Sequence, residues 1–220
     1  MAALLGRPWF WIAAVAILFG VPLGRSLLRS VPSPPPVLGT VPRFELTDQA
    51  ARRFGTDQLG GKVWVANFIF TACQGSCPAL SQKMAEVQHR SRHLGADFHL
   101  VSITVDPERD TPARLAEYGA RYGADPQKWS FLTGPLAAVQ AAVVDGFKVG
   151  MGKTARPGAP DAAAAVATDR RTVDDDFWEI FHGENLVLID QHLQIRGYFP
   201  ATIEGLNRLV EAIGLVINSA

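Results

Sequence analysis

One apolar run constrains the fold of this 220-residue chain more than any other feature. Residues 62–70 read KVWVANFIF, in which β-branched and aromatic side chains predominate and only Lys62 is charged. The run follows the glycine pair Gly60-Gly61, which is typical of a turn. A nearly continuous apolar stretch of this length is typical of a strand that is covered on both faces of its sheet. We therefore predict a central, buried strand at 62–70.

Strand-like and helix-like segments alternate along the rest of the chain. Apolar and β-branched runs indicate strands, whereas apolar residues at helical spacing indicate amphipathic helices. Such alternation, ending in a hairpin and a helix, predicts an α/β domain with a mixed sheet and helices on both faces. The pattern fails between 150 and 173, where we expect a long loop. The expected strands are 43–46, 62–70, 98–105, 129–133, 185–190 and 193–199, and the expected helices are 78–94, 112–122, 135–145 and 203–213.

The N-terminal region is of another kind. Residues 8–24 carry no charge and are bounded by Arg7 and Arg25, with Trp9 and Trp11 near one edge. A run of about 17 residues is at the short end of what a membrane-spanning helix requires. Tryptophan is enriched at membrane interfaces. We predict an N-terminal transmembrane helix that anchors the chain, with a cleaved signal peptide as the alternative.

The predicted organisation is that of an exported domain held near a membrane. The sequence VPSPPP after the apolar run predicts a stiff, extended spacer. The formal net charge is zero, so composition gives no electrostatic reason to expect nucleic acid as a partner. We expect a single-pass protein of a bacterial inner membrane that faces the periplasm, with an organelle inner membrane as the alternative. The predicted regions are a membrane anchor or signal segment at 1–30, a proline-rich linker at 31–42 and a domain at 43–220.

The two cysteines of the chain, Cys73 and Cys77, directly follow the predicted central strand. A thiol between a strand and a helix lies near the positive end of the helix dipole, which lowers its pKa and favours the thiolate. Three kinds of site remain open: a soft-metal site, for which two thiolates select Cu(I) above all; a redox dithiol; or a structural disulfide. Zinc held by two cysteines and two histidines is the competing metal site.

Among the five histidines, His182 is the candidate for a third ligand. It lies in an apolar, aromatic segment immediately before a predicted strand. Two thiolates and one imidazole suit copper as Cu(I) or Cu(II). The other four have simpler interpretations: His89 and His93 on a solvated helix face beside arginines, His99 as a structural residue within a strand, and His192 in an exposed hairpin turn.

Taken together, these motifs resemble the Sco/SenC family. The resemblance covers about residues 44–216, and an N-terminal anchor is also typical of that family. Its two specific segments lie at 70–78 and 101–112. The matching residues are FTACQGSCP at 70–78, Met84, VSITVDPERDTP at 101–112, and His182 before an apolar strand that ends in Asp190.

The resemblance implies a thioredoxin-like fold and copper bound by Cys73, Cys77 and His182. It implies a membrane-tethered copper chaperone, rather than an enzyme, whose partner is the copper-bearing subunit of cytochrome c oxidase, chiefly its binuclear copper centre, or another copper acceptor. A thiol–disulfide oxidoreductase is the alternative, with Cys73 and Cys77 as redox-active residues that keep the acceptor's thiols reduced. A tethered binding domain with a structural disulfide is a third interpretation.

Overall fold

The computed structural model describes residues 8–27, 32–73, 75–147, 152–153, 178–179 and 185–219. By its internal contacts the chain divides into two compact units, Met1–Ser33 and Pro34–Ala220. Most of the predicted loop at 150–173 lies outside the described residues. The elements of the second unit are β1 (Gly39–Thr40), β2 (Glu45–Asp48), β3 (Arg53–Gly55), α3 (Thr56–Leu59), β4 (Val63–Ile69), α4 (Ser76–Arg90), a 3₁₀ helix (Arg92–Asp97), β5 (Phe98–Thr104), α5 (Pro112–Arg121), β6 (Trp129–Thr133), α6 (Leu136–Gln140), a π-helical turn (Ala141–Gly146), β7 (Gly152–Lys153), β8 (Trp178–Glu179), β9 (Asn185–Ile189), β10 (Gln194–Pro200) and α7 (Ile203–Ile217).

Eight strands form one mixed sheet, in the order β1-β10-β9-β4-β5-β6-β2-β3. Strands β4, β5 and β6 are parallel, whereas β9 pairs with β4 and β2 pairs with β6 in the antiparallel sense. Every residue of β4 and of β5 is buried. The predicted central strand at 62–70 is therefore confirmed, and so is the mixed sheet.

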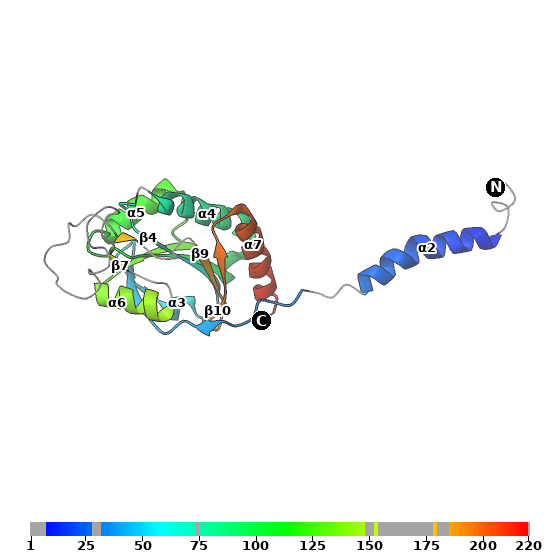
Figure 1. The fold of residues 1–220 in the computed structure, drawn as a ribbon, viewed down its shortest axis with the longest axis horizontal. Coiled ribbons are helices and arrows are strands. Elements are labelled where there is room, and N and C mark those ends of the chain that lie inside the picture. Colours follow the sequence, from blue (N-terminus) through cyan, green and yellow to red (C-terminus); the bar gives the residue numbers. More distant parts are fainter. Residues whose placement is uncertain are drawn as a thin grey trace, which may run out of the picture. The chain divides into compact units, whose positions relative to one another are not determined.

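Helices cover both faces of the sheet, as predicted (Figure 1). Helices α4, α5 and α7 lie on one face, where Met84, Leu115 and Leu209 are fully buried in one apolar cluster. On the other face α3, α6 and the π-helical turn enclose a second cluster, which contains Leu59 and Val143. The side chains of β4 alternate between the two clusters because successive residues of a strand point to opposite faces.

A buried polar chain fixes the register of the three parallel strands. The hydroxyl of Ser102 donates to the side-chain carbonyl of Asn67 (2.6 Å) and accepts from the indole nitrogen of Trp129 (2.8 Å). All three side chains are buried. A slip of one residue would turn these polar groups to the opposite face and leave them without partners, which is costly in an apolar interior.

The helix boundaries follow local capping chemistry. Thr111 accepts a hydrogen bond from the backbone of Arg114 (3.4 Å), and Pro112 is the first residue of α5, as predicted. The predicted end of α4 is too late, because the helix stops at Arg90. The hydroxyl of Ser91 donates to the carbonyl of Val87 (2.7 Å), and a 3₁₀ helix follows.

Part of the predicted linker at 31–42 lies against the domain. Gly39 pairs with Ile195 in the sheet, and Val41 is only 2% exposed. The carbonyl of Pro35 accepts a hydrogen bond from the guanidinium of Arg196 (2.8 Å). Removing the chain up to residue 42 would therefore strip an edge strand and a core side chain from the domain.

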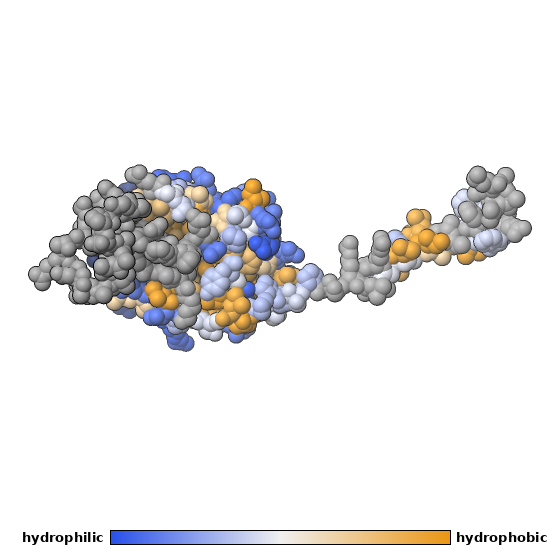
Figure 2. Space-filling model, viewed as in Figure 1, coloured by the Kyte–Doolittle hydropathy of each residue, from blue (hydrophilic) through white to orange (hydrophobic). Residues whose placement is uncertain are grey.

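The N-terminal unit contains helix α2 (Pro8–Leu27), which has Pro22 in its interior. Large apolar side chains such as Trp11, Leu18 and Phe19 are exposed along it, and Figure 2 shows hydrophobic side chains gathered on this helix. In the part of the chain that the structure describes, no helix combines the length and the hydropathy required to cross a membrane. The transmembrane helix remains a prediction.

We predict that Gly119→Ala lowers the free energy of unfolding by about 1–3 kcal/mol. A Cβ atom at Gly119 in α5 would lie 2.7 Å from the ring of Phe131, which is buried and stacked on Trp129. The matched control is Gly214→Ala in α7, where a Cβ atom meets nothing within 4 Å. Because alanine favours helix over glycine, the control should gain about 0.5–1 kcal/mol. Urea denaturation measures both, and two stabilised variants would contradict the close packing of α5 on β6.

Candidate metal and redox centre

The two cysteines lie where the buried strand β4 passes into α4. After Ile69 the chain turns, and the amide of Cys73 donates to the carbonyl of Phe70 (3.2 Å). Gly75 directly precedes α4, whose second residue is Cys77. Cys73 is thus held in a turn and is half-buried, whereas Cys77 is only 4% exposed. Neither cysteine forms a disulfide.

The pKa values of the two thiols are shifted in opposite directions. A hydrogen bond from the Cys77 thiol lowers the pKa of Cys73 from 9.0 to about 6, and backbone amides of residues 75–77 act in the same direction. The same hydrogen bond raises the pKa of Cys77, and its burial adds to that effect. At neutral pH the pair therefore holds a Cys73 thiolate and a Cys77 thiol. A thiolate is the form that attacks disulfides and binds soft metals.

A polar pair from two helices lies behind Cys77. The hydroxyl of Tyr118 in α5 lies 2.8 Å from that of Ser81 in α4 and 3.4 Å from the carbonyl oxygen of Cys77. Tyr118 and Ser81 are both buried, and burial raises the pKa of Tyr118. The phenol remains neutral and joins the first turn of α4 to α5.

Sequence reasoning did not connect two aspartates, Asp106 and Asp110, with the cysteine pair. Asp110 is fully buried and accepts hydrogen bonds from the backbone and the hydroxyl of Thr71, two residues before Cys73. Asp106, in the same segment, is also buried, and burial together with Asp110 raises its pKa. A sequence signal existed, because the aspartates follow a predicted strand as the cysteines do, and the carboxyl ends of parallel strands meet at the same edge of a sheet.

The third predicted ligand, His182, lies outside the described residues. Over the residues that are described, no three His, Cys, Asp or Glu side chains are arranged to hold a metal ion. The structure thus brings Cys73 and Cys77 together, and the place of His182 stays a prediction. His89 lies on α4 and His93 on the following 3₁₀ helix, both away from the cysteines in sequence, and His89 contacts the guanidinium of Arg92.

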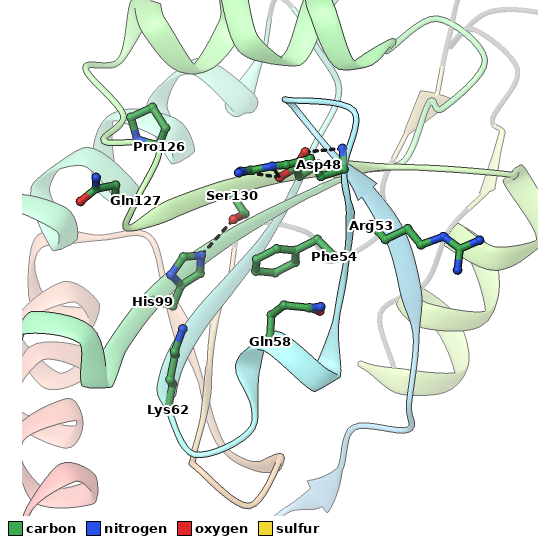
Figure 3. Close-up of a pocket in the computed structure, with 10 residues that line it drawn as sticks. Asp48, Arg53, Phe54, Gln58, Lys62, His99, Pro126, Gln127 and Ser130 are labelled. Atoms are coloured by element: carbon green, nitrogen blue, oxygen red, sulfur yellow. Dashed lines mark hydrogen bonds and ion pairs between the residues drawn. The ribbon is translucent and has the colours of Figure 1, made fainter.

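An open depression of about 490 Å³ lies where β5 and β6 begin, at the end of the parallel strands that is opposite to the cysteine turn (Figure 3). Its floor contains His99, which is stacked on Phe54 and bonded through Nε2 to the hydroxyl of Ser130 (2.9 Å). Burial and the nearby Lys62 lower the pKa of His99 to about 4. His99 is therefore a neutral, packed residue, as expected.

The chain belongs to the SCO1/SenC family, which it matches over residues 35–215. It is 35% identical to the SCO1 protein homolog of Bacillus subtilis over 91 residues, which is 41% of this chain and 47% of that protein. A Stutzerimonas stutzeri protein, named as a candidate for copper binding, is 30% identical over 179 residues, or 79% of this chain and 76% of its own. The matched region spans about half the length of the first of these curated relatives.

Solved structures of the same family share the thioredoxin-like fold. A SCO1/SenC family lipoprotein of Bacillus anthracis superposes with a TM-score of 0.65 at 26% identity, over 81% of this chain and 95% of its own. The copper-bound ScoI of Bradyrhizobium japonicum gives a TM-score of 0.60 at 23% identity, over 79% and 99% of the two chains. The predicted thioredoxin-like fold is therefore confirmed.

We predict that Cys77→Ala raises the pKa of Cys73 and slows its alkylation at pH 7 by about tenfold or more. The reason is that the variant lacks the thiol whose hydrogen bond stabilises the Cys73 thiolate. The rate of iodoacetamide reaction is measured against pH in wild type and variant. A pH profile that is the same in both would contradict the assignment of Cys77 as the donor.

The lowered pKa of His99 predicts that the protein loses stability in acid. Because its folded pKa is about 4 and its ordinary value is 6.5, only the unfolded chain takes up the proton between those pH values. Stability is therefore lost as pH falls from 6.5 to 4, by on the order of 2 kcal/mol. Chemical denaturation of His99→Gln should show a shallower pH dependence than wild type. The control His93→Gln, an exposed position, should follow wild type.

Proposed function

We propose that this protein is a membrane-tethered copper carrier that binds copper through Cys73, Cys77 and His182 and passes it to an acceptor. One observation carries the proposal: two unbridged thiols are held together at the start of α4, with a thiolate on one of them at neutral pH. Soft thiolate ligands select Cu(I), and a third, imidazole ligand extends the site to Cu(II).

The family relationship supports copper as the cargo. The structural relative from Bradyrhizobium japonicum was solved with copper bound, and so was that from Arabidopsis thaliana, which has a TM-score of 0.63. Zinc remains the competing metal, but two cysteines and one histidine leave its usual four-ligand structural site incomplete.

Strand register supports His182 as the third ligand. Trp64 pairs with Ile189 and Ala66 with Val187, so β9 runs opposite to β4. The start of β9 at Asn185 therefore lies beside the end of β4, from which the cysteine turn leaves. The chain from His182 to Asn185 can span at most about 11 Å. A tether of this length keeps His182 near the end of β4, as the proposed ligand set requires.

The proposed acceptor is the copper-bearing subunit of cytochrome c oxidase, chiefly its binuclear copper centre. BsSco, described as a member of the Sco family of cytochrome c oxidase assembly proteins, matches with a TM-score of 0.64. The exposed apolar side chains of α2 suit an anchor in a bacterial inner membrane, with the domain in the periplasm. Anchoring keeps the carrier near an acceptor in the same membrane, which raises the effective concentration of the two sites.

A second function, thiol–disulfide exchange, is favoured by the asymmetry of the cysteines. Cys73 is half-buried and forms a thiolate at neutral pH, as an attacking thiol requires. Cys77 is buried beside it and is placed to resolve a mixed disulfide. A disulfide switch has been identified in BsSco, which shares the fold. The same pair could therefore both carry copper and reduce the thiols of an acceptor.

Copper titration of the full chain in detergent tests the first function. We expect one copper per reduced wild-type chain, with a thiolate-to-Cu(II) charge-transfer band, and no stable copper in Cys73→Ser or Cys77→Ser. His182→Ala should lose at least tenfold more affinity for Cu(II) than for Cu(I), because two thiolates still hold the softer ion.

A histidine elsewhere provides the matched control. His93→Ala removes an exposed imidazole and should bind copper as wild type does. Equal Cu(II) binding by His182→Ala and His93→Ala would overturn the three-ligand site. Wild-type protein that binds no copper, yet exchanges disulfides readily, would replace the carrier with a thiol reductase.

A further inference from the structure

We infer that Asp110 is a positioning residue, whose buried carboxylate clamps the turn that carries Cys73 and so brings the two sulfurs together for chelation or disulfide formation. The inference rests on the proposed function, in that it takes the cysteine pair as the reactive site. It adds a residue that contacts neither sulfur and acts through Thr71.

Both oxygens of the Asp110 carboxylate are engaged. Oδ1 accepts from the hydroxyl of Thr71, while Oδ2 accepts from the backbone amide of Thr71 (3.0 Å) and from the hydroxyl of Thr104 (2.5 Å). Asp110 and Thr104 are each 0% exposed. The carboxylate therefore joins the end of β5 to the turn after β4.

The segment around Asp110 is itself built to present that carboxylate. The amide of Asp110 donates to the carbonyl of Asp106 (2.9 Å), and the amide of Asp106 donates to the hydroxyl of Thr104 (3.1 Å). Immediately afterwards Thr111 caps α5. The carboxylate thus projects from a tight turn between a buried strand and a capped helix, so its position is fixed by two rigid elements.

Other hydrogen bonds of the described part of this turn lie within the cysteine segment itself. The amide of Cys73 bonds within the turn, to Phe70, and the backbone of Phe70 also forms a hydrogen bond with the sulfur of Cys77. Cys77 is fixed independently, because it lies in α4 and is packed in the core. The position of Cys73 relative to Cys77 therefore depends on the turn, and the two hydrogen bonds from Thr71 to Asp110 tie this turn to the segment after β5.

A clamp of this kind favours any state in which both sulfurs bind one partner. Fixing the two thiols in one geometry before reaction removes an entropic cost that a freely moving turn would bear at that moment. The same reasoning applies to a shared copper ion and to an intramolecular disulfide. Loosening the turn should therefore weaken both, even though neither sulfur has lost a contact to Asp110.

The test measures the disulfide equilibrium of the full chain in detergent against reduced and oxidised glutathione, without copper. Formation of one Cys73–Cys77 disulfide converts one oxidised glutathione into two reduced ones, so the equilibrium constant is well defined. Thr71→Val removes the hydroxyl bond and leaves Oδ1 without its donor. We expect this constant to fall about tenfold. Thr71→Ser keeps a hydroxyl and should recover most of the wild-type value.

Thr202→Val is the matched control. Thr202 caps α7 by accepting from the amide of Gly205 (3.1 Å), so its loss destabilises the fold at a distance from the cysteines in sequence. The control should leave the disulfide equilibrium unchanged. Asp110→Asn provides a second variant, in which an amide replaces one acceptor oxygen, and we expect a reduction at least as large as that of Thr71→Val.

The outcomes are separable. If Thr71→Val and Asp110→Asn lower the free energy of unfolding but leave the disulfide equilibrium at the wild-type value, Asp110 has only a structural role and the inference is overturned. Wild-type protein that fails to bind copper would remove the proposed cargo. A tenfold effect on the disulfide equilibrium would still support the clamp in that case, because the measurement contains no copper.

Discussion

The parallel pairing of β4 and β5 is the interaction on which the rest of the structure depends. Seven consecutive residue pairs, from Val63 with Phe98 to Ile69 with Thr104, hold the two strands side by side in the interior. Because the strands are parallel, the chain leaves both at the same edge of the sheet. The cysteine turn and the Asp110 segment are therefore neighbours in space, although Thr71 and Asp110 are 39 residues apart in sequence.

The unequal acidities of the two sulfurs follow from where the strand becomes a helix. Cys73 precedes the helix and keeps contact with solvent, whereas Cys77 is already within α4 and packs in the core. The buried thiol donates its hydrogen bond to the half-buried sulfur, and this places negative charge on the more accessible of the two sulfurs. Spacing and helix geometry together divide the pair into an outer nucleophile and an inner partner.

Much of this arrangement can be predicted from sequence because its signals are local. The apolar run at 62–70 and the helix expected to begin at 112 have direct counterparts in β4 and α5. The short hairpin partner β3 and helix α3 were not predicted, since a strand at Arg53–Gly55 has too few residues to display a period. The contribution of Gly39–Thr40 to the sheet was also missed, because the surrounding prolines favour an extended spacer and the pairing with β10 is a tertiary contact.

The clamp at Asp110 marks the limit of sequence reasoning here. The sequence Asp110-Thr111-Pro112 is typical of a helix start, and Thr111 and Pro112 do serve α5 as its cap and first residue. The carboxylate is instead turned away from its own helix, toward Thr71, and only the strand register reveals this. One short segment thus serves both the fold and the site: the residues that begin α5 fix the aspartate, and the aspartate fixes the turn that carries Cys73.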